Sequence, residues 1–258
     1  MGRILDSLSF RFKRFQLGLL GQTRGIFRPK IGGKRIELRF PEDEKEVHLH
    51  EFHRIFIDDC YGLMAINQPI RTVLDIGANA GLFSLAARHR FRNATIHAYE
   101  PNSSALEQLK WNTSNYQVST FGEAVGACTG TVSLIAGENS LHSVAKRLDH
   151  GAIPQIAFGD AIGRLGQRID LLKLDCEGAE WEILEVDYDW SRVRFLTMEY
   201  HLWARPGSNL ADIRNLIESR GFNIMSIYPS ASNAFGLLRA QRRSSNDRLE
   251  KESRGNTL

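Results

Sequence analysis

The stretch that decides the fold is Arg71-Thr72-Val73-Leu74-Asp75-Ile76-Gly77-Ala78-Asn79-Ala80-Gly81. Its short apolar run is typical of a strand buried on both faces of a parallel sheet. Gly77 and Gly81 then form a tight turn, because residues without a Cβ accept positive φ and let a ligand approach the backbone. Residues 82–88 predict a helix that begins at once. A strand, a glycine turn and a helix N-terminus form the usual nucleotide-binding unit of an open α/β sheet.

The spacing of this turn indicates which kind of nucleotide would bind. A dinucleotide fingerprint reads G-x-G-x-x-G and holds a pyrophosphate, whereas this turn reads Asp75-x-Gly77-x-Asn79-x-Gly81. The carboxylate of Asp75 would repel a pyrophosphate, but it suits a ligand that carries an ammonium or sulfonium group. The turn resembles motif I of class I S-adenosylmethionine (SAM) methyltransferases. A glycine turn of some other α/β protein is the alternative.

Length and composition limit the class of protein. The 258 residues, 42% of them hydrophobic, are enough for one large domain with extensions. The net charge of +3 comes mostly from the two ends of the chain, so no basic face predicts nucleic-acid binding. Three isolated cysteines indicate neither a disulfide framework nor a zinc site and favour a reduced, cytoplasmic protein. No signal peptide and no run of roughly 18 apolar residues is evident.

We expect three parts along the chain. Residues 1–65 would be an N-terminal extension, whose basic, aromatic first 30 residues predict peripheral contact with an anionic membrane, an extension packed on the domain or a disordered arm. Residues 66–240 would form the SAM-dependent methyltransferase domain, and residues 241–258 a disordered tail. His48, His50 and His53 lie close together, but their spacing does not place all three on one face, so we predict no metal site there.

The periodicity of the chain predicts an α/β fold with a doubly wound, mostly parallel seven-stranded sheet that ends in an antiparallel hairpin, a Rossmann-like arrangement. Ile36 to Phe40 and Thr131 to Ile135 would be additional strands, and Ser104-x-x-Glu107 would be a capping box that opens a helix. Besides the first strand, the sheet would contain residues 94–100, 116–121, 169–174, 193–201, 222–228 and 234–239.

Two of the predicted strands end in residues suited to the nucleoside of a cofactor. Glu100, followed by Pro101, ends the second strand 23 residues after Gly77, close to the position of the acid that binds ribose hydroxyls in such folds. Glu123 and Ala124 follow the third strand, where they would form the adenine edge or an ordinary turn.

Acids also gather after the fourth and fifth strands. Asp175 and Glu177 follow the fourth strand, and Glu199 and His201 end the fifth. Asp175 would face the methionyl amine or the acceptor. His201 is the first candidate for a general base because an unperturbed imidazole has a pKa of about 6.5, with Glu177 and Glu199 as rivals. Glu180 suits the first turn of the following helix through the helix dipole.

Together these segments resemble the FkbM-type methyltransferase family over residues 71–201. The matching segments are VLDIGANAGLFSL, AYEPN, EAVG, DLLKLDCEGAEWEIL and MEYH, of which K-x-D-x-E-G-A-E is the most specific. Cys176 stands where an aliphatic or small residue is common. The resemblance implies a SAM-dependent O-methyltransferase that acts on hydroxyls of sugars, glycans or natural products.

The expected reaction is an in-line displacement, in which a substrate hydroxyl attacks the methyl carbon of SAM. Asp75 and Gly77 would hold the methionine end of the cofactor, and Asn79 and Gly81 of the same turn would also bind the cofactor. The sequence assigns no metal ligands, although Asp175, Glu177 and Glu199 would suit a Mg²⁺ ion that lowers the pKa of the acceptor. The alternatives are an NAD(P)-binding oxidoreductase and a SAM-binding protein without activity. The acceptor and the oligomeric state are not predicted.

Overall fold

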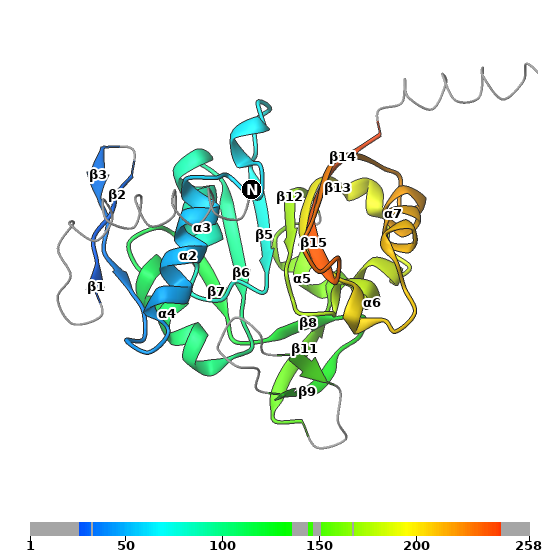
Figure 1. The fold of residues 1–258 in the computed structure, drawn as a ribbon, viewed down its shortest axis with the longest axis horizontal. Coiled ribbons are helices and arrows are strands. Elements are labelled where there is room, and N and C mark those ends of the chain that lie inside the picture. The colour runs from blue at the N-terminus through cyan, green and yellow to red at the C-terminus, as the bar shows by residue number, and fades with distance from the viewer. Residues whose placement is uncertain (1–25, 32, 136–143, 147–150, 167, 244–258) are drawn as a thin grey trace, which may run out of the picture.

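Seven strands form the central sheet in the order β14-β15-β13-β12-β5-β6-β7 (Figure 1). The structure is a computed structural model that describes residues 26–31, 33–135, 144–146, 151–166 and 168–243. Of these seven strands, β15 alone runs in the opposite direction to the others, so the predicted mostly parallel sheet with a terminal hairpin is confirmed. The strands are β5 (Thr72–Ile76), β6 (Thr95–Tyr99), β7 (Val118–Phe121), β12 (Ile169–Leu174), β13 (Val193–His201), β14 (Phe222–Pro229) and β15 (Phe235–Arg242).

Helices cover both faces of this sheet because successive residues of the central strands point to opposite sides. Val73 and Leu171 belong to one buried cluster, and their neighbours Leu74 and Leu172 belong to the other. Figure 1 shows helices on both sides of the sheet. The first cluster is covered by α2 (Lys45–Phe56) and α3 (Leu82–Arg90), with α4 (Ser103–Thr113) beside them, and the second by α5 (Phe158–Arg164), α6 (Glu180–Glu185) and α7 (Leu210–Ser219).

The predicted capping box at the start of α4 is wrong. Asn102 caps this helix instead, because its side chain accepts hydrogen bonds from the backbone N–H groups of Ser104 (3.0 Å) and Ala105 (3.2 Å). Glu107 stays exposed and lies 3.8 Å from Arg39. The helix therefore begins one residue before the predicted cap.

A second, four-stranded sheet is inserted after β7, where the sequence predicted one strand. It contains β8 (Ala124–Gly126), β9 (Gly130–Ile135), β10 (Val144–Lys146) and β11 (Ile153–Ala157) in the order β10-β9-β11-β8. The predicted strand at residues 131–135 is thus confirmed as part of β9. Ala124, which was expected in a strand-end turn, instead lies in β8 and is paired with Gln155.

The N-terminal part packs on the same core as the sheet. Four two-residue strands form two small antiparallel sheets, in which the first strand pairs with the fourth and the second with the third. The predicted strand at residues 36–40 is reduced to Leu38–Arg39. Phe27, Leu38 and Phe52 are buried in the cluster that also holds Val73 of the central sheet. The remaining strands are β1 (Ile26–Phe27), β2 (Lys30–Ile31), β3 (Lys34–Arg35) and β4 (Leu38–Arg39).

The predicted membrane-contacting segment and the predicted tail fall mostly on residues 1–25 and 244–258, which lie outside the described residues. Within the described part of the chain, no helix is both long and apolar enough to cross a bilayer.

Candidate active site at the strand ends

The glycine turn after β5 is packed directly against the end of β12. Gly77 has a φ of +78°, and a Cβ at this position would lie 1.7 Å from the carbonyl oxygen of Asp175. Only glycine fits so close an approach. Gly81, with a φ of +86°, precedes the first residue of α3. The turn therefore has a fixed shape that depends on both glycines.

Asp75 is fully buried below this turn, and its partners come from the protein itself. Its carboxylate accepts a hydrogen bond from Ser84 Oγ (2.7 Å) and lies 3.3 Å from Lys173 Nζ. Lys173, which is 3% exposed, also donates a hydrogen bond to the carbonyl oxygen of Gly77. Although burial opposes its charge, Asp75 and Asp175 raise the pKa of Lys173. Asp75 therefore lies below the turn between Ser84 and Lys173, and its contact with a cofactor remains a prediction.

Glu100 connects the end of β6 to the glycine turn. One of its carboxylate oxygens accepts a hydrogen bond from Asn79 N, and the other accepts one from Asn102 N, both at 2.8 Å. Burial raises the pKa of Glu100 to about 7, although the two amides oppose this shift. Asn79 itself has a φ of +45°, and its side chain accepts a hydrogen bond from Ala80 N. Pro101, which lies between Glu100 and Asn102 in the chain, is half-buried.

The residues predicted for the adenine edge have other contacts in the structure. Glu123 forms an ion pair with Arg164 of α5, and the guanidinium of Arg164 lies 5.2 Å from the ring centroid of Phe121. Contact of Glu123 and Ala124 with adenine remains a prediction.

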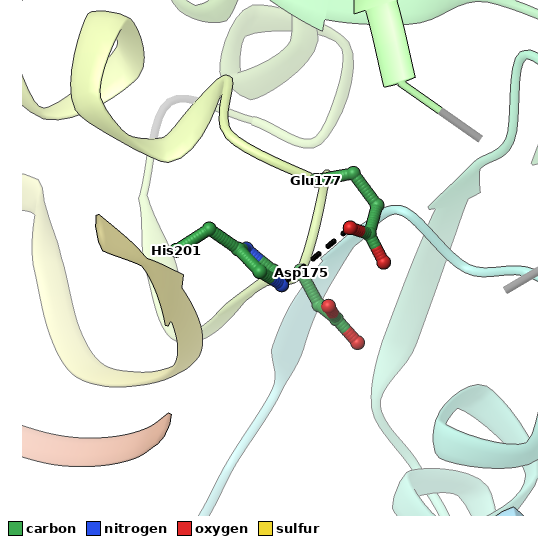
Figure 2. A group of neighbouring side chains, drawn as sticks. All are labelled: Asp175, Glu177 and His201. Atoms are coloured by element: carbon green, nitrogen blue, oxygen red, sulfur yellow. Dashed lines mark ion pairs between the residues drawn. The ribbon is translucent and has the colours of Figure 1, made fainter. Parts of the chain in front are cut away.

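The structure brings together the four residues predicted for catalysis at the ends of β12 and β13. His201 Nε2 lies 3.6 Å from Glu177 Oε2 and 3.9 Å from Glu199 Oε1. Figure 2 shows the imidazole of His201 directed at the loop that carries Asp175 and Glu177. Side chains from two adjacent strands thus meet above the glycine turn.

Glu180 anchors this cluster from below. Its side chain is fully buried and accepts hydrogen bonds from Cys176 N (2.6 Å) and Gly178 N (2.8 Å). The same carboxylate lies 3.3 Å from His201 Nδ1. Glu180 therefore holds both the loop after β12 and the imidazole, a larger role than the helix-dipole contact expected from its position.

The shared environment shifts the pKa values of the cluster. Burial opposes a charge on His201, but its hydrogen bond to Glu180 and the nearby carboxylates raise its pKa to about 9. Burial raises the pKa of Glu177 to about 8, with His201 opposing, and that of Glu199 to about 7, with Asp175 adding to the shift. Lys173 and His201 outweigh burial and lower the pKa of Asp175. At neutral pH the imidazole is therefore protonated.

Three side chains that contact the candidate site were not predicted from the sequence. Tyr61 donates a hydrogen bond to Asp175 Oδ2 (2.7 Å), and Arg54 of α2 donates one to Glu199 (3.0 Å). No sequence spacing links these N-terminal residues to strands more than 100 residues away. The third, Lys173, had a visible signal: it is a cation within an otherwise apolar strand, two residues before Asp175 and hence on the same side.

Helix α2 also forms one wall of a small cavity above the glycine turn. The cavity has a volume of about 40 Å³ and is lined by His48 and Glu51 of α2, by Tyr61, and by Asn79 of the turn. At the other side of the cluster, the exposed ring of Trp203 lies 5.4 Å, centroid to centroid, from the imidazole of His201. The candidate site is thus bounded on one side by α2 and Tyr61 and on the other by Trp203, which follows β13.

The strand order, the glycine turn and the acids at the strand ends define a class I SAM-dependent methyltransferase. The chain belongs to the FkbM methyltransferase family, because the Methyltransferase FkbM domain matches residues 75–224. This finding sets aside the NAD(P) alternative.

Several known proteins are similar to this chain. Methyltransferase sdnD of Sordaria araneosa is 30% identical over 67% of this chain and 81% of its own length. The 31-O-demethyl-FK506 methyltransferase FkbM of Streptomyces tacrolimicus is 25% identical over 73% of this chain and 89% of its own. The solved structure of magnesium protoporphyrin IX methyltransferase (ChlM) from Synechocystis PCC 6803 with bound SAM is 15% identical, with a TM-score of 0.48 over 90% of this chain and 91% of that chain.

Proposed function

We propose that this protein is an O-methyltransferase that moves the methyl group of SAM to a hydroxyl of a sugar, glycan or natural-product-like acceptor. The observation that carries this proposal is the group of carboxylates around His201, which offers a proton acceptor at the strand ends beside the glycine turn. A hydroxyl needs such a base, because it must lose its proton as it attacks. The name of the FkbM relative, a 31-O-demethyl-FK506 methyltransferase, is in line with a hydroxyl acceptor.

The cofactor would lie across the glycine turn. Glu100 would accept hydrogen bonds from the ribose hydroxyls. Each of its two carboxylate oxygens already accepts one hydrogen bond, from Asn79 N or Asn102 N, and has a second lone pair that can accept another. The turn from Gly77 to Gly81 would hold the methionine end, with Lys173 and Asp75 fixing its shape from below. Glu123 and Ala124 would border the adenine.

Glu199 is the proposed general base. His201 was the first candidate on sequence, but a pKa of about 9 makes it an imidazolium at neutral pH. Glu199, with a pKa of about 7, matches the operating pH better than Glu177 at about 8. As the acceptor oxygen bonds to the methyl carbon, its proton would pass to Glu199. The carbon–sulfur bond breaks with its electron pair left on sulfur, which gives S-adenosylhomocysteine.

The acceptor would enter past the aromatic rings next to His201. Trp203 is 45% exposed and Phe235 is 37% exposed, and their ring centroids lie 5.4 and 6.4 Å from that of His201. Exposed rings beside a polar cluster suit an acceptor that offers both an apolar ring face and a hydroxyl.

Calorimetry and a transfer assay test this function together. The purified protein is titrated with SAM and with S-adenosylhomocysteine, and is then incubated with methyl-labelled SAM and panels of hydroxylated, amine and thiol acceptors. We expect SAM binding, and label on oxygen in the hydroxyl panel. Absence of SAM binding would refute the cofactor assignment, whereas label found only on nitrogen, sulfur or carbon would refute O-methylation.

A further inference from the structure

We propose that Asp175, Glu177 and His201 form a binding site for a divalent first-row transition-metal cation such as Mn²⁺. One ligand atom from each of the three side chains lies within 4.8 Å of the other two. Ligand atoms around a cation at about 2.2 Å stand about 3 to 4.4 Å apart, so small side-chain movements complete the site.

The imidazole is oriented to act as a ligand once a cation displaces the proton on Nε2. Its Nδ1 faces the buried carboxylate of Glu180 at 3.3 Å, and its Nε2 points to Glu177 and Glu199 at 3.6 and 3.9 Å. The latter two distances exceed that of a hydrogen bond, although the His201 side chain is only 4% exposed. A carboxylate behind one ring nitrogen fixes the orientation and tautomer of a metal-binding histidine.

The local charge also favours a cation. Lys173 forms an ion pair with Asp175, and Arg54 forms one with Glu199. Among the described residues, Glu177 and Glu180 share a single cationic partner, His201. Both contacts of Asp175 with Tyr61 and Lys173 use Oδ2, so its Oδ1 is available as a ligand.

This ligand set differs from the one considered on sequence. Glu199 is held by Arg54 at 3.0 Å, and His201 takes its place as the third ligand. One imidazole with two carboxylates suits Mn²⁺ or a neighbouring first-row cation better than Mg²⁺, which prefers oxygen ligands alone.

The role of the cation rests on the proposed function. Bound at the ends of β12 and β13, it would hold the acceptor oxygen beside the cofactor and lower the pKa of the hydroxyl. Glu199, which is not among the three ligands, would take the proton.

Mn²⁺ binding to the metal-depleted full-length chain tests the site without any activity measurement. Electron paramagnetic resonance follows the free Mn²⁺ signal during titration of the wild type, Glu177→Gln, His201→Gln and the control Glu182→Gln, which changes an exposed acid on α6. We expect one bound Mn²⁺, at least about tenfold weaker binding in the first two variants, and unchanged binding in the control. No binding to the wild type at millimolar Mn²⁺, or equal affinity in all four proteins, would overturn the proposal.

Two further measurements separate the possible causes of failure. Pulsed electron paramagnetic resonance on the wild-type protein detects ¹⁴N coupling from a ligating imidazole, so it needs no variant that might unfold. Bound Mn²⁺ without this coupling would overturn the assignment of His201 as a ligand.

SAM titration in parallel separates the metal site from the proposed function. SAM binding without Mn²⁺ binding refutes the metal site alone, whereas Mn²⁺ binding without SAM binding refutes the proposed function.

Discussion

Lys173 Nζ lies 3.3 Å from Asp75 Oδ1, and this buried ion pair joins β12 to β5 below the glycine turn. The two side chains are 3% and 0% exposed, so water does not screen them. Because the same ammonium lies 3.5 Å from Asp175, one cation contacts both the turn and the first acid of the cluster around His201.

Replacing Lys173 by Met should therefore be strongly destabilising. It leaves Asp75 as a buried carboxylate without its counter-ion, which costs about 3–5 kcal/mol of the free energy of unfolding. Urea unfolding measures this loss. The control is Arg205→Met, which removes an exposed ion pair with Glu185 and should cost less than about 1 kcal/mol. If both variants lose the same free energy, Lys173 does not have this role.

The affinity for SAM should rise with pH through about 7. Ribose hydroxyls donate to a carboxylate, so SAM binding favours ionised Glu100, whose pKa without cofactor is about 7. Below this pH the proton must leave before binding, and affinity falls by up to about tenfold per pH unit. Calorimetry one pH unit below and one above that value measures the effect. Glu100→Gln is the control, because it removes the titrating carboxyl while any effect of pH on SAM itself stays the same for both proteins. If the affinity of the variant depends on pH as strongly as that of the wild type, the ribose contact is contradicted.

Replacing Glu199 by Gln should abolish most turnover without loss of SAM affinity. The amide cannot take the acceptor proton, so kcat should fall by about 10²- to 10⁴-fold. The acceptor identified by the labelled-SAM screen allows the rate to be measured, and calorimetry reports SAM affinity. Glu182→Gln, an exposed acid on α6, is the matched control. Near-normal turnover of the Glu199 variant would exclude this residue as the base.

Trp203→Ala should weaken acceptor binding while SAM affinity remains unchanged. Losing the contact of a half-exposed ring costs about 1–2 kcal/mol, so KM for the acceptor should rise roughly tenfold. Steady-state kinetics at saturating SAM measures KM and kcat separately. Met225→Ala, which removes an exposed apolar side chain from β14, should leave KM unchanged. A loss of kcat without a change in KM would argue against an acceptor contact.

Local sequence predicted most of the fold because its signals act over short distances. The apolar run before Gly77 predicted β5, and similar runs predicted the other six strands of the sheet. The predicted first and last residues differ from the observed ones by small amounts. The capping error arose where two side chains competed. Asn102 and Ser104 can each cap a helix. The backbone N–H of Asn102 donates a hydrogen bond to Glu100, which fixes this residue in place and favours its side chain as the cap.

The sequence by itself determined the sheet, the glycine turn, the family and the four polar residues at the ends of β12 and β13. Only the tertiary structure decided which partner each of these residues has. Arg54 and Tyr61 reach Glu199 and Asp175 across more than 100 residues, and Glu180 holds His201 from another element. Protonation depends on burial and on charges brought close by folding, so the pKa values that move the proposed base from His201 to Glu199 have no local signal in the chain.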